Sequence, residues 1–186
     1  MSGIENSLLK IYSFTEEQLD HFTEKLNFQK LRKKDFLLKP RQISRCLTFI
    51  NKGSLRLYTH TENNEHTINF FTENIWVADL ESLLMQKPSA NYIEAIEDTD
   101  ISTITLKDIH LLMDTYPCFR MLNSLLVNSA IPTAHLSSIK TQNPDERYRD
   151  LLKTSPDWLK RFPQHQIASY LGMTPETLSR VRGRLV

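Results

Sequence analysis

The chain begins with a helical pattern and then changes to a strand-like one. Phe14, Leu19, Phe22 and Leu26 recur near helical spacing, and Thr15 is a suitable residue to begin a helix. Several strands at close spacing predict a small antiparallel barrel or sandwich over residues 27–106, interrupted by a helical segment over 76–85. The short alternating or apolar runs that predict these strands cover 30–38, 46–50, 54–58, 67–71, 92–96 and 101–105.

The third region is helical and carries a longer repeat. A helix over 107–114 ends before Pro117, and beyond it apolar and small residues alternate steps of four and three, which is typical of a helix packed along a partner helix. Pro132 removes a backbone donor, so we expect a kink near 128–131. This stripe either pairs with a second chain, which we expect, or packs on the barrel. The residues of the predicted dimer interface are Cys118, Leu122, Leu125, Ser129 and Leu136.

The fourth region opens with a strong helix start. Asn143 is a good N-cap, Pro144 suits the first helical position, and Glu146 lies three residues after the cap. Pro156 ends this helix, and residues 140–143 are the predicted linker. We therefore predict two domains: a sensor domain over 1–140, whose dimerisation helix covers about 107–140, and a second domain over 141–186.

The most informative stretch is residues 164–184. An apolar face around Ala168 predicts a short helix, and Gly172 after it can take the positive φ that a tight turn needs. Thr174 caps a second helix, whose buried face carries Leu178 and Val181. The opposite face is basic. A plain helical hairpin shares part of this pattern. Here, however, the small residue, the turn glycine, the helix cap and the basic face occur together, which favours a DNA-reading helix-turn-helix.

Charge is distributed unevenly along the chain. Residues 140–186 hold nine Lys or Arg against five Asp or Glu, whereas the whole chain has a formal net charge of only +1. A basic module beside an acidic or neutral one suits a phosphate-bearing partner, and a solvated basic tail is the alternative.

With these features, the chain resembles the Crp/Fnr superfamily of bacterial transcription regulators over nearly its whole length. Residues 49–58 stand in place of the strand–glycine–strand signature of its cyclic-nucleotide-binding-type β-roll, and 144–152 with 162–180 resemble its DNA-binding domain. The resemblance implies an α+β fold with an N-terminal antiparallel, jelly-roll-like β-roll, a long dimerisation helix and a C-terminal helix-turn-helix domain. The sequence stops at Val186, so we do not expect a complete wing.

The resemblance also transfers residues. Family members read DNA with an acid, a small polar residue and an arginine on the second helix, and Glu176, Ser179 and Arg180 match these positions. Arginine can bind guanine O6 and N7, and glutamate can accept from cytosine N4. The arrangement is similar to that of the Fnr-like branch, which implies a TGA-type half-site. With phosphate contacts included, the predicted DNA-binding residues are Thr174, Glu176, Ser179, Arg180, Arg182 and Arg184.

The nucleotide cassette departs from the family pattern. By position, Ala78 replaces a glycine, Asp79 a glutamate and Ser89 the phosphate-pairing arginine. An anionic phosphodiester needs a compensating charge, so we predict no cyclic AMP binding; Lys87 as a substitute is the less favoured alternative. Nearby aromatic residues either fill the β-roll core, which we favour, or line an effector pocket. The candidate effector-pocket residues are Phe70, Trp76, Asp79, Ser89 and Tyr92.

Neither a cofactor nor a metal is expected. The two cysteines exclude a four-cysteine zinc or iron–sulfur site within one chain, and the histidines lack ligand-like spacing. We expect Cys46 to be a buried hydrophobe, with a redox sensor as the alternative. A cupin-type metal enzyme would need clustered His and Glu ligands, and motifs such as a nucleophile elbow are missing. We therefore expect no enzyme.

These observations predict a cytoplasmic, homodimeric transcription regulator that binds double-stranded DNA at inverted repeats. RNA polymerase and an unknown small-molecule effector are candidate further partners. No membrane partner is expected, because no apolar run approaches about 20 residues. The alternative is a ligand-binding or protein-interaction module whose C-terminal hairpin does not read DNA.

Overall fold

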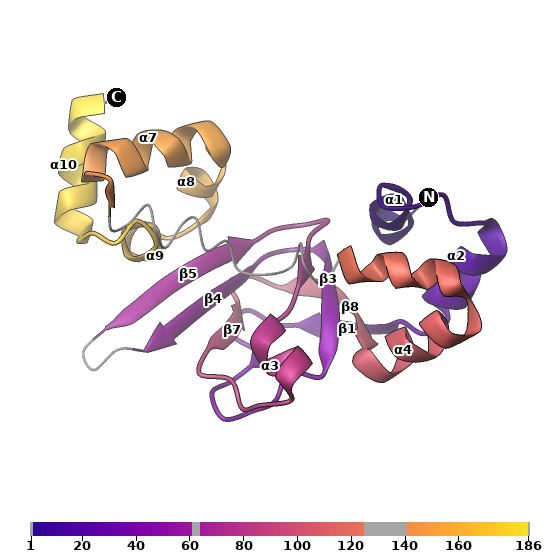
Figure 1. Cartoon of the computed structure of the whole chain (residues 1–186). Coiled ribbons are helices and arrows are strands. Elements are labelled where there is room, and N and C mark those ends of the chain that lie inside the picture. The colour runs from indigo at the N-terminus through magenta and orange to yellow at the C-terminus, as the bar shows by residue number, and fades with distance from the viewer. Residues whose placement is uncertain (1, 61–63, 125–140, 186) are drawn as a thin grey trace. The chain divides into compact units, whose positions relative to one another are not determined.

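The computed structural model describes residues 2–60, 64–124 and 141–185 (Figure 1). The chain divides into two compact units. One comprises Met1–Arg56 with Phe70–Ile131, and the other comprises Leu57–Asn69 with Pro132–Val186. The linker predicted at 140–143 begins outside the described residues, so the domain boundary stays a prediction.

The first unit begins with two short capped helices, α1 (Gly3–Leu9) and α2 (Glu16–Thr23). In both, the N-cap side chain and the residue three positions later exchange hydrogen bonds with each other's backbone, forming a capping box. The helix predicted behind Thr15 is confirmed. The helix α1 is not among the predicted elements, because seven residues with two buried apolar side chains carry too little periodicity to be recognised.

The strands form two four-stranded sheets, with the orders β1-β8-β3-β6 and β2-β7-β4-β5. The paired strands whose registers are known run antiparallel, as the spacing predicted. The mixed α+β architecture is therefore confirmed. The strands are β1 (Asn27–Leu31), β2 (Phe36–Leu38), β3 (Cys46–Lys52), β4 (Leu55–His60), β5 (Glu65–Phe71), β6 (Trp76–Val77), β7 (Tyr92–Ala95) and β8 (Thr99–Thr105).

The helix predicted over 76–85 is wrong at its beginning. Trp76 and Val77 form strand β6, which pairs with β3, and helix α3 (Leu80–Met85) starts only after Asp79. The Asp79 carboxylate caps α3 by accepting a hydrogen bond from the Ser82 N–H at 3.1 Å. The apolar run of strand and helix is continuous, so hydrophobic periodicity alone does not separate the two elements.

An aromatic core closes one end of the first unit, where α1, α2 and α4 (Leu106–Thr115) lie close to β3 and β8 (Figure 1). The Trp76 ring packs at 5.0 Å from Phe49 and 6.2 Å from Phe22, both in edge-on geometry. Such pairs contribute about 0.5–1.5 kcal/mol each beyond their buried area. The helix predicted over 107–114 is confirmed as α4, and a 3-10 helix, η1 (Pro117–Leu122), follows it.

The second unit contains four helices among its described residues. These are α7 (Pro144–Thr154), α8 (Trp158–Arg161), α9 (Gln164–Tyr170) and α10 (Pro175–Leu185). Asn143 caps α7 in a capping box with Glu146, as predicted. Tyr148, Ala168 and Val181 are among the fully enclosed side chains that join these helices.

No helix in the described ranges has the length and apolar character needed to cross a membrane.

The turn between β3 and β4 depends on a glycine. Gly53 has φ +94°, and an added Cβ would lie 2.5 Å from Thr99 Oγ1 and 2.7 Å from the Asp98 carbonyl oxygen. We expect Gly53→Ala to lower the free energy of unfolding by about 2 kcal/mol or more. The control is Gly183→Ala in α10, where an added Cβ would meet no neighbouring atom of the described residues within 4 Å; it should raise stability by roughly 0.5–1 kcal/mol. Urea denaturation measures both, and equal effects would contradict this account of the turn.

Candidate nucleic-acid interface and effector site

The turn between α9 and α10 is built as the sequence predicted. Gly172 has φ +61°, a left-handed conformation that suits glycine. The Met173 N–H donates to the Ala168 carbonyl at 3.0 Å and the Gly172 N–H to the Ser169 carbonyl at 3.1 Å, which closes the end of α9. Thr174 then begins α10, its hydroxyl accepting from the Thr177 N–H at 3.3 Å.

The two faces of α10 have opposite character. Leu178 and Val181 are buried at 1% and 0% exposure, so this face of α10 packs into the core. Glu176, Ser179 and Arg180 are exposed on the rest of the surface. The structure therefore brings the three predicted base-reading residues onto the solvent-facing side of one helix.

The Glu176 carboxyl is held in its charged form. Its own backbone N–H and the Thr174 hydroxyl act as hydrogen-bond donors to it, and the Arg180 charge adds a smaller attraction, so the pKa of Glu176 is lowered. A carboxylate that stays ionised remains an acceptor only, which is the form that can accept from an amino group.

Arg147 of α7 is a positioning residue whose role the sequence pattern did not predict. Its Nη1 donates to the carbonyls of Leu171 and Gly172, at 2.5 and 3.2 Å. These are carbonyls at the end of α9, where the helix leaves acceptors without partners. The guanidinium therefore ties α7 to the turn that precedes α10. A lone arginine on a helix gives no sequence signal for this role.

The remaining predicted phosphate contacts lie at the other end of α10. Arg182 is half-buried, and Arg184 is exposed but its Nη2 pairs with Asp145 Oδ1 at 2.5 Å. Asp145 lies in the first turn of α7, so this ion pair links α7 to α10. The sequence did not predict this ion-pair partner of Arg184.

Only part of the predicted dimer interface can be placed. Cys118 and Leu122 belong to the 3-10 helix η1, and Leu122 is 1% exposed within the aromatic-rich core of its own protomer. Leu125, Ser129, Leu136 and the predicted kink at 128–131 lie outside the described residues. Dimerisation through this stripe stays a prediction.

Two of the predicted effector residues come together in the cassette after β6. Ser89 Oγ donates to the buried Asp79 carboxylate at 2.6 Å, and Asn91 Nδ2 donates to the same oxygen at 3.1 Å. With the Ser82 N–H, the carboxylate thus accepts three hydrogen bonds. A small cavity of about 180 Å³ adjoins this cluster. The Ser82, Ser89 and Asn91 donors beside this cavity are thus already bonded to the carboxylate of Asp79.

The aromatic members of that predicted pocket lie elsewhere. Trp76 is part of the aromatic core, where its Nε1 donates to Ser7 Oγ at 3.0 Å. Phe70 is 1% exposed, and Tyr92 packs against Phe36 with a ring separation of 5.8 Å. None of these three side chains borders the cavity beside Asp79.

The surroundings of Cys46 lower the reactivity of its thiol. Cys46 is half-buried and free, and its pKa is raised by burial and by the nearby Asp108 carboxylate, against a smaller opposing effect of Arg45. A raised pKa leaves less of the reactive thiolate at neutral pH. Across the described ranges, no group of three or more His, Cys, Asp or Glu side chains is arranged to hold a metal ion.

The chain is similar to proteins of known family and fold. The cyclic nucleotide-binding domain family matches residues 28–116. A CooA mutant from Carboxydothermus hydrogenoformans is 16% identical, with a TM-score of 0.69 over 96% of this chain and 82% of that one. FixK2 from Bradyrhizobium japonicum is 16% identical, with a TM-score of 0.68 over 86% and 84%. The catabolite activator protein of Thermus thermophilus is 22% identical, with a TM-score of 0.56 over 94% and 85%. No curated protein gives a significant match.

The match and the fold agree with each other. Residues 28–116 match the cyclic nucleotide-binding domain family. The chain as a whole has a fold similar to those of CooA, FixK2 and the catabolite activator protein. The α+β fold that the resemblance implied is thereby confirmed.

The Glu176 environment can be tested by titration. Because its folded pKa is lowered, Glu176 should remain ionised below the usual range of a glutamate, and the stability it adds should be lost only as the pH falls through that lowered value. Thr174→Val should move the Glu176 pKa upward and weaken α10 by about 1 kcal/mol through loss of the cap. Carboxyl chemical shifts followed by NMR measure the pKa. An unchanged value in the variant would contradict the role of the Thr174 hydroxyl.

Proposed function

We propose that the chain is a sequence-specific, DNA-binding transcription regulator of the Crp/Fnr type. The observation that carries this proposal is the exposed face of α10, which presents Glu176, Ser179 and Arg180 while Leu178 and Val181 are buried behind it. A helix with a committed apolar face and an exposed polar face fits the width of the major groove.

The exposed side chains suit direct reading of bases. Arg180 can donate two hydrogen bonds to guanine O6 and N7, and the ionised Glu176 can accept from cytosine N4. Arg180 Nη2 already lies 3.3 Å from Thr177 Oγ1, so its guanidinium is held near the start of the helix. Ser179 can bond to either a base or a phosphate.

Phosphate contacts would fix the helix in the groove. Thr174, Arg182 and Arg184 flank the base-reading residues, and phosphates supply most of the sequence-independent affinity. In the free protein Arg184 is paired with Asp145, so a phosphate must compete with that carboxylate.

The protein is proposed to act as a homodimer on inverted repeats. Two symmetric α10 helices would enter successive major grooves about 34 Å apart. Such a dimer would be sited in the cytoplasm, with RNA polymerase as a further partner.

The regulator is proposed not to respond to cyclic AMP. The Asp79 carboxylate is 4% exposed and already accepts from Ser82, Ser89 and Asn91. A phosphodiester brought to this place would meet a buried like charge and would find its donors occupied.

The direct test of the proposal is selection from random duplex DNA by the purified full chain without added ligand. We expect recovery of an inverted repeat with half-sites one helical turn apart. Recovery of a single unpaired half-site would contradict the dimer. Recovery of background sequences only would favour a module whose C-terminal helices do not read DNA.

The recognition residue is tested on the selected sequence. Arg180→Ala should cost about 1–3 kcal/mol of binding free energy per half-site and relax specificity at one base pair. The matched control is Arg149→Ala, which removes an exposed arginine of α7 and should weaken all sequences alike through lost charge. Fluorescence anisotropy with cognate and scrambled duplexes separates the two effects. Unchanged base preference in Arg180→Ala would refute the assignment.

Cyclic AMP is tested separately, because the nucleotide and DNA proposals can fail independently. We expect millimolar cyclic AMP to leave the Tm of the chain unchanged, because a ligand that binds only the folded state would raise it. Isothermal titration calorimetry should likewise show no binding heat at two temperatures. Saturable heat or a raised Tm would contradict the argument from Asp79.

A further inference from the structure

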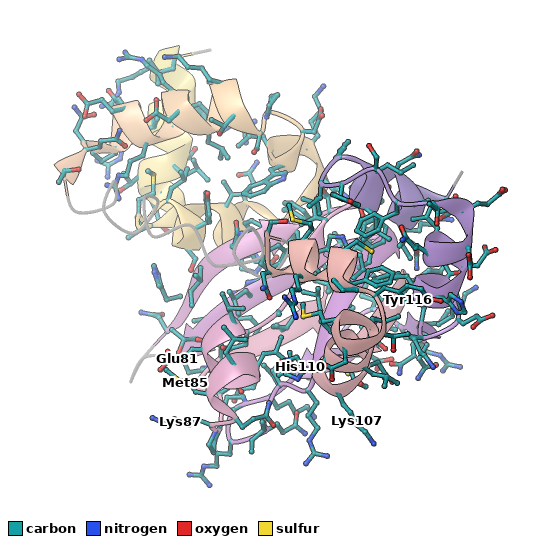
Figure 2. The ribbon with its side chains drawn as sticks, turned by 45° about the vertical axis from the view of Figure 1, so that its right-hand side comes forward. Glu81, Met85, Lys87, Lys107, His110 and Tyr116 are labelled. Carbon is teal, nitrogen blue, oxygen red and sulfur yellow. The ribbon has the colours of Figure 1, made fainter. Side chains whose placement is uncertain are left out.

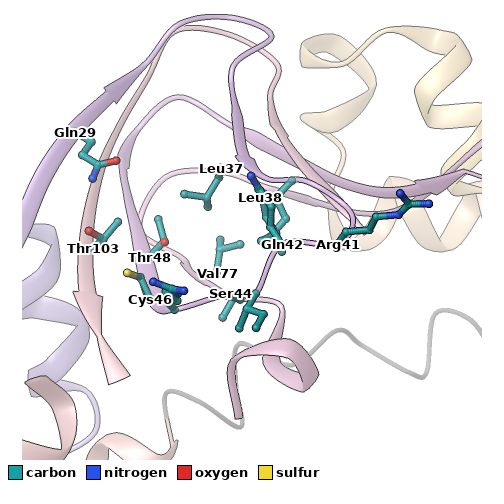
Figure 3. Close-up of a pocket in the computed structure, with 14 residues that line it drawn as sticks. Gln29, Leu37, Leu38, Arg41, Gln42, Ser44, Cys46, Thr48, Val77 and Thr103 are labelled. Carbon is teal, nitrogen blue, oxygen red and sulfur yellow. The ribbon is translucent and has the colours of Figure 1, made fainter. Parts of the chain in front are cut away.

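A second cavity of about 580 Å³ lies within the first unit, between strands of the two sheets (Figure 3). It is about three times the volume of the cavity beside Asp79, and it lies in the size range of small-molecule sites. None of the five residues predicted from sequence to line an effector pocket borders it. The residues of its own walls therefore determine what it can bind.

One wall is a polar patch on the face of a sheet. Cys46 and Thr48 are two residues apart on β3, so their side chains point to the same face, and Thr48 pairs directly with Thr103 of β8 (Figure 3). Gln29 of β1 completes this wall. Thr48 is 1% exposed.

The opposite wall is apolar. Leu37 and Leu38 come from β2 and Ile93 from β7, whereas Val77 of β6 pairs with Thr48 and so adds an apolar group to the first wall. Leu38 and Ile93 are at most 5% exposed, so the opposite wall is fixed by the packing of the domain. A ligand in this cavity would have hydrocarbon on one side and hydroxyl, thiol and amide groups on the other.

The charge around the cavity has one sign. No Asp or Glu lines it, whereas the exposed Arg41 and Arg45 do. Neither guanidinium forms an ion pair with a described residue. The Asp108 carboxylate acts on Cys46 but does not line the cavity, and it accepts a hydrogen bond from the Thr105 hydroxyl.

Arg45 also borders a neighbouring cavity of about 470 Å³. Lys107 and His110 of α4 line this 470 Å³ cavity together with Arg45 (Figure 2). Basic side chains of two elements therefore border this neighbouring cavity. A carboxylate at Arg45 can accept charge-assisted hydrogen bonds, which are among the strongest available.

We propose that the 580 Å³ cavity binds a small organic acid with an apolar body. The hydrocarbon part lies between Leu38 and Ile93 on one side and the sheet wall with Val77 and Thr48 on the other, where the Thr48 hydroxyl can donate to a polar atom of the ligand. The carboxylate lies at the rim and pairs with Arg45. A neutral molecule would leave the arginines unused, and inorganic phosphate would leave the apolar wall exposed to water. This inference concerns the first unit alone and does not depend on DNA binding.

Cys46 supplies a reporter inside the cavity. In a Cys118→Ser background it is the only cysteine of the chain, so alkylation by iodoacetamide followed by mass spectrometry reports access to this cavity alone. Because burial raises the Cys46 pKa, the reaction should be run at mildly alkaline pH. Octanoate is the probe acid, octan-1-ol has the same apolar body without the charge, and inorganic phosphate has charge without the body.

We expect octanoate to slow Cys46 alkylation in a saturable way, by about tenfold at ten times its dissociation constant. Octan-1-ol and phosphate should protect far less. Arg45→Gln should remove most of the protection by octanoate, whereas the control Arg32→Gln, an exposed arginine that does not line the cavity, should retain it. Thr48→Val, which keeps the side-chain shape, should give an intermediate loss.

Two results would overturn the proposal. The first is an alkylation rate that octanoate does not change while the circular dichroism of the chain stays native. The second is equal protection by octanoate and octan-1-ol that persists in Arg45→Gln, which would show an apolar cavity without acid recognition.

Discussion

The register of β3 against β8 is the constraint on which the first unit depends. Along β3, Leu47 and Phe49 enter the aromatic core, while Cys46 and Thr48 face the cavity between the sheets. Thr48 is paired with Thr103 and Leu47 with Ile104. Because successive side chains of a strand point to opposite faces, a slip of one residue would exchange the core face and the cavity face together. Core packing therefore determines which polar groups line the cavity.

The second unit depends on polar contacts to α7 as much as on its small core. Arg147 holds the carbonyls at the end of α9, and the pair between Arg184 and Asp145 holds the last turn of α10. The first contact is part-buried and involves a charged donor, so it should be worth more than the exposed ion pair. The orientation of the exposed face of α10 thus follows from a neighbouring helix as well as from its own sequence.

The cavity beside Asp79 and the 580 Å³ cavity differ in the charge they present. In the cassette after β6, the negative charge of Asp79 is internal to the chain and is satisfied by Ser89 and Asn91. Around the larger cavity, the free charges are positive and belong to Arg41 and Arg45. In this chain the positive charge that a ligand could meet therefore lies outside the cassette, beside a cavity between other strands.

The sequence by itself determined the class of fold, the order of most elements and the helix pair at the C-terminal end of the chain. These features rest on local signals: alternation along strands, the caps at Thr15 and Asn143, and the positive φ of Gly172. The sequence did not separate β6 from α3, because one apolar run covers both elements. Only the tertiary structure placed Trp76 in the aromatic core, gave Arg147 its carbonyl partners and opened the cavity beside Arg45. Each of these joins residues far apart in the chain, and no local periodicity encodes which distant side chains meet.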